Sequence, residues 1–225
     1  MKGTYYSVGA GPGDPQLLTL KAIEILRNCP VVALPDSGAG NRAVRAIVEP
    51  YLEGREVVEC SMPMTRDTEI LKAAHREAAE KLAAYLDRGL SVAFPTLGDP
   101  SVYSTAAYVQ QELEAMGYRT AMVPGVPSFC AAAAALNTTL CEGNQPLHIL
   151  PAGYTGAPDD LQGNLILMKS GRRVGQVIRD LKDRDRRIMA VECCGMEEQR
   201  IHRTGDSIPE DASYFCTILV KEMGK

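Results

Sequence analysis

The sequence predicts an α/β fold of two lobes. Apolar residues make up 45% of the 225 residues, which is enough to build a core in one large domain or in two small ones. Strand-like and helix-like segments alternate through the first half, whereas strand-like segments dominate the second half. The change comes at Pro124-Gly125-Val126-Pro127, a run of turn-forming residues that predicts a linker.

The first half has the pattern of a mainly parallel sheet with helices between its strands. An apolar series with helical spacing runs from Leu17 to Leu26 and stops before Pro30. Gly89 predicts the end of a long amphipathic helix, and Ser101 predicts the N-cap of the next helix. The expected strands are residues 5–8, 31–34, 57–58, 90–94 and 119–123, and the expected helices are residues 17–26, 42–52, 69–88 and 101–116.

The second half predicts a mixed or partly antiparallel sheet, because its strands follow one another with few helices between them. We expect strands at residues 147–150, 164–168, 187–192, 200–204 and 214–220, and helices at residues 128–136 and 174–181. The two expected lobes are therefore residues 1–123 and 124–225, with the linker at 124–127.

Charge and cysteine content argue against several classes of protein. The net charge is −4 and no long basic run occurs, which argues against a nucleic-acid partner. Seven cysteines without a Cys-x-x-Cys pair favour reduced thiols, so we expect neither a disulfide framework nor a bound metal. The N-terminus lacks an apolar stretch of signal-peptide length, and no window of about 18 apolar residues occurs. We therefore expect a soluble, cytoplasmic protein without a membrane partner.

The first glycine-rich turn follows an expected strand and precedes an expected helix. Gly9, Gly11 and Gly13 come one residue short of the dinucleotide-binding spacing, and Pro12 lies inside the turn. No acidic residue ends the second expected strand in a clear ribose-binding place, and no Gly-Lys-Ser/Thr sequence indicates a phosphate-binding loop. By itself the turn fits a ligand site or a structural strand-to-helix connection.

Two further turns follow expected strands. Gly98-Asp99-Pro100 leads into small hydroxyl-bearing residues, and residues 123–131 place small residues at a helix start. Ligands of open α/β sheets bind at the carboxyl ends of strands. An ordinary β-turn and a tightly packed helix face explain these two segments equally well.

Taken together, the three turns resemble the tetrapyrrole methylase family in kind, order and spacing. Met168 at a strand end and the segments Leu17–Ala22 and Val191-Glu192-x-x-Gly195 are further matches, so the resemblance covers essentially the whole chain. The run Leu-Gly-Asp-Pro-Ser-x-Tyr-Ser-Thr from Leu97 and the run Ser-Phe-x-Ala-Ala-Ala from Ser128 are most similar to one branch of the family. Its members methylate C20 of precorrin-2 or cobalt-factor II in cobalamin biosynthesis.

The resemblance implies a class III methyltransferase with two α/β lobes and a folded S-adenosylmethionine in the cleft between them. It also implies a homodimer and a tetrapyrrole substrate. The cofactor-binding residues that the resemblance implies are Pro12, Leu97, Gly98, Asp99, Val102, Pro127, Ser128, Phe129, Met168 and Gly195.

Two positions depart from the family pattern. Pro127 lies where relatives usually carry Thr, so a polar contact at this place must come from Ser128. Some relatives that methylate uroporphyrinogen carry an Asp, proposed as a base, at the end of the second strand. Here Pro35 occupies that place and Asp36 follows it, so Asp36 is a candidate base with a turn residue as the alternative.

Methyl transfer from a sulfonium to carbon depends on aligning the two reactants and excluding water more than on a strong base. His75, His148 and His202 are far apart in the sequence and fit structural or surface roles better than catalysis. A tetrapyrrole carries many carboxylates, for which arginine is the preferred partner. The candidates for such contacts, which solvated surface charge explains equally well, are Arg42, Arg45 and Arg66.

The leading functional hypothesis is methylation of C20 of precorrin-2 or of its cobalt complex. One alternative is methylation of another corrin precursor carbon. Methylation of a protein or of ribosomal RNA is a second, and the acidic balance counts against RNA. A non-enzymatic tetrapyrrole-binding module is a third, against which the retained cofactor-loop residues argue. The sequence leaves open whether the substrate contains cobalt.

Overall fold

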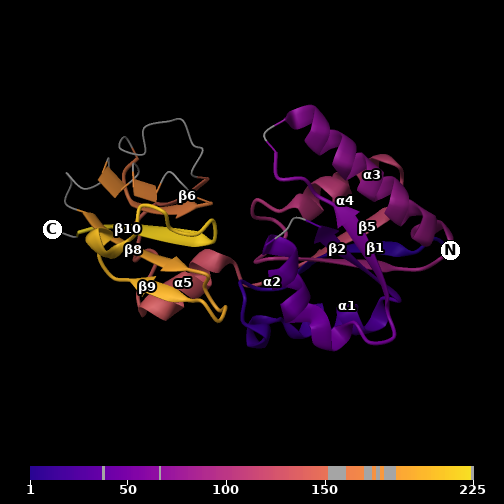
Figure 1. The fold of residues 1–225 in the computed structure, drawn as a ribbon, viewed down its shortest axis with the longest axis horizontal. Coiled ribbons are helices and arrows are strands. Elements are labelled where there is room, and N and C mark those ends of the chain that lie inside the picture. The colour runs from indigo at the N-terminus through magenta and orange to yellow at the C-terminus, as the bar shows by residue number, and fades with distance from the viewer. Residues whose placement is uncertain are drawn as a thin grey trace. The chain divides into compact units, whose positions relative to one another are not determined.

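A computed structural model of the chain describes residues 1–36, 39–65, 67–151, 161–169, 174–175, 178–179 and 186–223. The contacts of these residues form two compact units, Met1–Pro127 and Ser128–Lys225 (Figure 1). By these contacts, the expected linker at 124–127 groups with the first unit. Among the described residues, each unit contains one five-stranded sheet.

The sheet of the first unit is parallel. Its strands, in the order β3-β2-β4-β1-β5, are β1 (Thr4–Gly9), β2 (Val31–Asp36), β3 (Glu56–Ser61), β4 (Val92–Thr96) and β5 (Arg119–Val123). All neighbouring strands in this order pair in parallel, which confirms the predicted arrangement. Because parallel strands point the same way, the segments that leave β1, β4 and β5 all start at one edge of the sheet.

The strand β2 is longer than the sequence predicts. The expected strand ends at residue 34, but Pro35 and Asp36 continue it and pair with the last two residues of β3. Proline lacks an N–H for a sheet ladder. Because β2 pairs with β4 only at Val31 and Val32, Pro35 lies where only β3 is a partner. Asp36 is therefore the last residue of β2, and its absence from a ribose-binding place stays a prediction.

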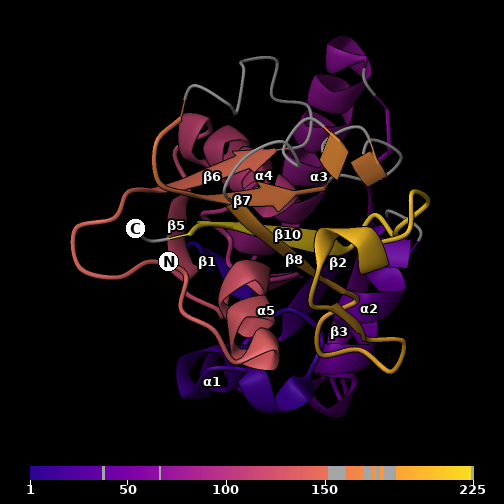
Figure 2. The same cartoon turned by 90° about the vertical axis from the view of Figure 1, so that its left-hand side faces the viewer.

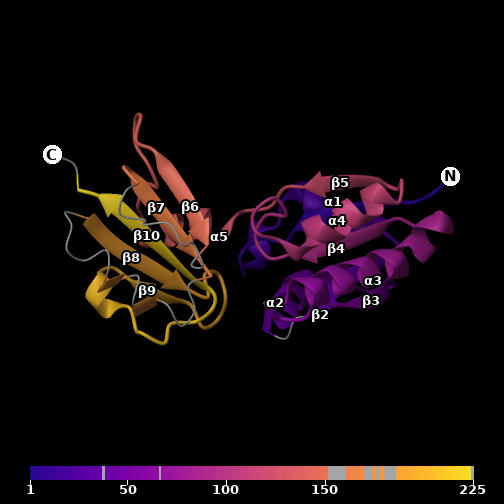
Figure 3. The same cartoon turned by 90° about the horizontal axis from the view of Figure 1, so that it is seen from above.

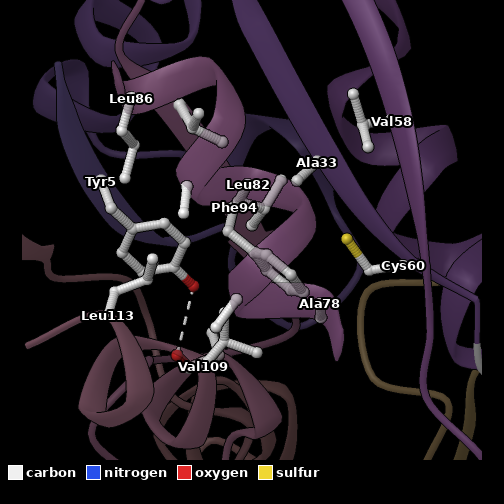
Figure 4. Packing of buried hydrophobic residues seen from close by; sticks show 14 of the residues in the cluster. Tyr5, Ala33, Val58, Cys60, Ala78, Leu82, Leu86, Phe94, Val109 and Leu113 are labelled. Atoms are coloured by element: carbon white, nitrogen blue, oxygen red, sulfur yellow. Dashed lines mark hydrogen bonds between the residues drawn. The ribbon is translucent and has the colours of Figure 1, made fainter. Parts of the chain in front are cut away.

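Helices cover both faces of the first sheet. The helices α1 (Leu20–Asn28) and α2 (Ala39–Val48) lie on one face, and α3 (Thr68–Asp87) and α4 (Thr105–Ala115) lie on the other (Figure 1). Under α3 and α4, the rings of Tyr5 and Phe94 lie 6.1 Å apart at their centroids. The Tyr5 hydroxyl donates to the carbonyl oxygen of Ala106 at 3.2 Å, so this buried phenol has a hydrogen-bond partner (Figure 4).

Local caps account for helix ends that differ from the prediction. The helix α1 begins at Leu20 rather than residue 17, because the Thr19 hydroxyl accepts the N–H of the first turn and residues Pro15–Leu17 form a separate 3-10 turn. The helix α4 begins at Thr105 rather than residue 101, because Ser104 and not Ser101 is its N-cap. The helix α2 ends at Val48, and Glu49–Tyr51 continue as a 3-10 turn.

The sheet of the second unit is mixed, as predicted. After α5 (Ser128–Leu136), its strands are β6 (Leu147–Pro151), β7 (Asn164–Met168), β8 (Arg186–Glu192), β9 (Arg200–His202) and β10 (Cys216–Glu222). Their order is β6-β7-β10-β8-β9; Figure 2 labels the first four of these strands, and Figure 3 labels all of them. The strands β6 and β7 pair in parallel, whereas the other pairs are antiparallel. The helix expected at 174–181 lies largely outside the described residues.

Both faces of the second sheet are covered. One face carries a core that includes Leu165, Ile188 and Ile218. Because side chains alternate along a strand, the neighbours of these residues point to the other face, where α5 packs on β8 and β10. None of the helices that the structure describes is long and apolar enough to cross a membrane.

Candidate functional site

The loops that follow β1 and β4 are joined at the carboxyl edge of the first sheet. The Gly98 N–H donates to the carbonyl oxygen of Gly11 at 2.8 Å, and the Gly11 N–H donates back to Gly98 at 3.2 Å. The Ala10 N–H donates to the carbonyl oxygen of Thr96 at 2.8 Å. The glycine-rich turn and the Gly-Asp-Pro turn, which lie about ninety residues apart in sequence, thus form one surface.

The loop after β5 joins the other two through very close backbone contacts. A Cβ atom added to Gly9 would lie 2.4 Å from the nitrogen of Gly125, and one added to Gly125 would lie 2.3 Å from the carbonyl oxygen of Gly98. The Thr19 hydroxyl also donates to the carbonyl oxygen of Pro124 at 3.2 Å. Glycine is needed at both positions because any side chain would overlap backbone atoms.

Asp99 connects two of these loops through its carboxylate. One oxygen accepts the N–H of Gly125 at 2.9 Å, and the other accepts the N–H of Ser101 at 2.8 Å and the Ser101 hydroxyl. Burial raises the pKa of Asp99, but these hydrogen bonds outweigh burial and hold that pKa below its ordinary value of 3.8. Asp99 is therefore ionised at neutral pH and is suited to accepting hydrogen bonds rather than to taking up a proton.

The other expected cofactor residues of the first unit lie in the same loops. Pro12 is buried, whereas Leu97, Val102 and Pro127 are half-buried. Gly98 has φ +74, so a side chain at this position would strain the backbone. The apolar side chains thus stand beside a charged carboxylate at a partly open sheet edge.

Two of the expected residues of the second unit, Ser128 and Met168, lie beside Thr217 near the start of β10. The buried hydroxyl of Thr217 donates to the hydroxyl of Ser128 at 3.3 Å, and Thr217 is paired in register with Met168 at the end of β7. Gly195 has φ +77, and its N–H donates to the side-chain oxygen of Gln199 at 2.7 Å. Phe129 is buried in the first turn of α5. Sequence reasoning missed Thr217, because its position beside Met168 arises only from strand pairing.

Asp36, the candidate base, lines a hollow of about 180 Å³ in the first unit. The hollow lies between β3 and α3, and the ammonium group of Lys81 donates there to the carbonyl oxygen of Glu59 at 2.8 Å. Burial raises the pKa of the Cys60 thiol in this hollow to about 11, so Cys60 is not an activated nucleophile. The basic role of Asp36 stays a prediction.

The three histidines have structural surroundings. His75 is buried and stacks on Tyr108 with ring centroids 4.9 Å apart. The Nε2 atom of His148 lies 2.9 Å from the carbonyl oxygen of Gln162, and His202 pairs with Glu192. That none of the three is a catalyst stays a prediction.

The structure describes two of the three candidate arginines and all seven cysteines. Arg42 is exposed on α2, whereas Arg45 pairs with Glu49 and Glu59 at 3.5 and 3.4 Å; Arg66 lies outside the described residues. All seven cysteines are free thiols. Within the part of the chain that the structure describes, no group of three His, Cys, Asp or Glu side chains is arranged to hold a metal ion.

The apolar and hydrogen-bonding groups at the edge of the first sheet fit a ligand such as S-adenosylmethionine. That molecule presents an adenine ring with apolar faces, ribose hydroxyls and an ammonium group. The half-buried Leu97 and Val102 offer apolar contact, and the carboxylate of Asp99 retains acceptor capacity beyond its three internal donors. The small residues of these loops allow a ligand to come close to the backbone N–H and C=O groups at the same edge of the sheet.

The family assignment follows from the whole sequence. A model of the family described as Tetrapyrrole (Corrin/Porphyrin) Methylases matches residues 4–206. The chain belongs to the tetrapyrrole methylase family. The match includes all three loops and the segment of Glu192 and Gly195, so the resemblance predicted from the motifs is confirmed.

Individual members of the tetrapyrrole methylase family are similar over most of the chain. A probable cobalt-precorrin-2 C(20)-methyltransferase of Methanocaldococcus jannaschii is 35% identical over 187 residues, covering 83% of this chain and 80% of that protein. The cobalt-precorrin-2 C(20)-methyltransferase of Salmonella typhimurium is 31% identical, covering 99% and 98%. A uroporphyrin-III C-methyltransferase of Thermus thermophilus, solved with S-adenosylhomocysteine, has a TM-score of 0.71 at 23% identity and covers 98% of both chains.

Proposed function

We propose that this tetrapyrrole methylase transfers a methyl group from S-adenosylmethionine to C20 of precorrin-2 or of its cobalt complex in cobalamin biosynthesis. The observation that carries the proposal is similarity over 99% and 83% of the chain to two C20-methyltransferases, at 31 and 35% identity, together with the convergence of the three loops on one sheet edge. The metal content of the substrate stays open.

The residues of the first unit would hold the cofactor through the three joined loops. Leu97 and Val102 provide apolar contact, and Asp99 accepts hydrogen bonds while fixing the Gly125 loop in place. When bound, S-adenosylmethionine supplies a methyl group that its sulfonium charge already activates. Pro12, Gly98 and Pro127 shape the same edge, and Ser128, Phe129, Met168 and Gly195 would contribute from the second unit.

The protein's main tasks in this reaction are orientation and exclusion of water. The loops are fixed by hydrogen bonds and by backbone contacts that leave no room for side chains, so their geometry is set before any ligand binds. The expected lobes 1–123 and 124–225 belong to this proposal and derive from the change of sequence pattern at the linker 124–127. A homodimer, which derives from the family resemblance, and a cytoplasmic location, which derives from the cysteine content, belong to it as well. Light scattering that gives a mass near the 24.3 kDa of one chain would contradict the dimer.

Two alternatives differ in what they predict. A non-enzymatic tetrapyrrole-binding module would bind the tetrapyrrole but would give no heat on titration with S-adenosylhomocysteine. An enzyme acting on another corrin carbon would bind the cofactor but would leave precorrin-2 unchanged. The test is calorimetric titration with S-adenosylhomocysteine, followed by incubation of precorrin-2, with and without cobalt, with labelled S-adenosylmethionine. Cofactor binding and label transfer to either form support the proposal.

A further inference from the structure

The chemistry proposed above leaves one buried carboxylate of the second unit unused. Among the carboxylates that the structure describes, only that of Glu192 is almost completely enclosed, with 4% of the residue exposed. Glu192 is the last residue of β8 and follows an apolar strand interior. A buried charge is costly unless hydrogen bonds compensate it, so the partners of this side chain indicate what it does.

Both oxygens of the Glu192 carboxylate have close partners. One lies 2.8 Å from Nε2 of His202 on β9, and the other accepts the N–H of Ser213 at 2.6 Å. Burial raises the pKa of Glu192, but the hydrogen bonds from Ser213 and His202 and the nearby charge of Arg200 bring it below its ordinary value of 4.5. We call Glu192, His202 and Ser213 the Glu192 cluster; it links β8, β9 and the segment before β10.

The Glu192 cluster lies beside the start of the turn that carries Gly195. Cys193, the first residue of that turn, has φ +47, which is unfavourable for a residue with a side chain. Its N–H donates to the carbonyl oxygen of Phe215 at 3.3 Å, and its thiol lies 3.7 Å from the Ser213 hydroxyl. The Glu192 carboxylate holds the Ser213 segment against the start of the turn, and through His202 it also holds the strand that follows the turn.

We propose that Glu192 is a positioning residue that fixes the left-handed turn of Cys193 and Gly195 for cofactor binding. This inference rests on the proposed function, in which Gly195 belongs to the cofactor site. A hollow of about 230 Å³ adjoins the cluster and is lined by Glu192, Cys193, Glu198, Arg200, Asp211 and Ser213. Its carboxylates do not form a metal site, because no metal-holding group occurs among the described residues.

The test compares Glu192→Gln with a matched control in the same sheet. Glu222 lies at the other end of β10, and its carboxylate also accepts a backbone N–H, that of Gly163, at 2.6 Å. Calorimetric titration with S-adenosylhomocysteine should show the Kd of Glu192→Gln raised by roughly tenfold or more, because a charge-assisted contact is lost. The Kd of Glu222→Gln should stay within about twofold of the wild type, and the rate of Glu192→Gln at saturating cofactor within about threefold.

A second measurement does not depend on cofactor binding. Amide hydrogen exchange of Glu192→Gln should accelerate at residues 193–199 and 213–215 but not in β6 and β7. Uniform acceleration throughout the second unit, or an unchanged Kd in the folded variant, would overturn the inference. Where Glu192→Gln does not fold, His202→Phe replaces it and removes one of the two contacts. A wild type that binds no S-adenosylhomocysteine overturns the proposed function, while the exchange pattern still decides whether Glu192 fixes the turn.

Discussion

Replacing Asp99 by Asn tests whether its carboxylate holds the loops together or acts as a base. The substitution keeps the size of the side chain and one acceptor oxygen. If that oxygen still accepts the hydrogen bonds from Ser101, the new NH2 group faces the N–H of Gly125. Both groups are donors, so the hydrogen bond to Gly125 is lost. A hydrogen bond to a charged group contributes about 1.5–3 kcal/mol. We therefore expect the free energy of unfolding to fall by about 2 kcal/mol and Tm to fall by roughly 4–8 °C.

The consequence for activity follows from the same contacts. Loosening the Gly125 loop should weaken cofactor affinity by about tenfold, while the rate at saturating cofactor stays within about tenfold of the wild type. A general base would instead contribute on the order of 10²–10⁴ in rate. Calorimetry with S-adenosylhomocysteine and initial rates with labelled S-adenosylmethionine separate the two. A large loss of rate at unchanged cofactor affinity would refute the positioning role of Asp99.

The pH dependence of stability gives an independent check on Asp99. Its folded-state pKa lies below the ordinary value of 3.8, so the unfolded chain takes up this proton first. The stabilisation is fully present above about pH 5 and is lost as the pH falls through the folded-state pKa. The difference in unfolding free energy between wild type and Asp99→Asn should therefore be constant from about pH 5 to 8 and shrink below about pH 4. A difference that grows on acidification would contradict this account.

Two other substitutions test the packing of the first unit. Gly9→Ala places a Cβ 2.4 Å from the nitrogen of Gly125 and should cost about 3 kcal/mol or more of unfolding free energy. The control Gly54→Ala, at φ +70 with open space around it, should cost only about 1 kcal/mol, and equal losses in urea denaturation would argue against the loop contact. Burial keeps the pKa of His75 below its ordinary value of 6.5, so the wild type should lose stability as the pH falls through 6.5, because the unfolded chain binds the proton more readily. His75→Phe keeps a ring stacked on Tyr108 and should lack that loss; identical pH profiles of the two proteins would show that His75 is not its cause.

Elements with strong local patterns were predictable from the sequence. The expected bounds of α5 and β7 agree with the structure to the residue, because a run of small helix-forming residues and a short buried apolar run have one clear interpretation. The extension of β2 through Pro35 was not predictable, since it depends on which neighbour β2 pairs with at that point. The start of α4 was predicted at Ser101, but the N–H and the hydroxyl of Ser101 bond to Asp99, and Ser104 caps the helix instead.

The site was predictable in its loops but not in its connections. Three glycine-containing turns at strand ends are visible in the sequence, and so is their resemblance to a family. The hydrogen bond from Gly125 to Asp99 spans 26 residues, and the pairing of Glu192 with Ser213 spans 21, so neither has a local signature. A glutamate at the end of the apolar strand 188–191 is the one local signal that points to a buried carboxylate with partners.

The most direct test of the central claim is to locate the transferred methyl group. The protein is incubated with S-adenosylmethionine carrying a ¹³C-labelled methyl group and with precorrin-2, in metal-free and cobalt-containing forms. The product is then examined by carbon NMR. The account predicts one labelled methyl group, bonded to C20, in the product of at least one of the two substrates. A labelled methyl group on any other ring carbon, or no transfer to either substrate by protein that binds S-adenosylhomocysteine, would contradict it.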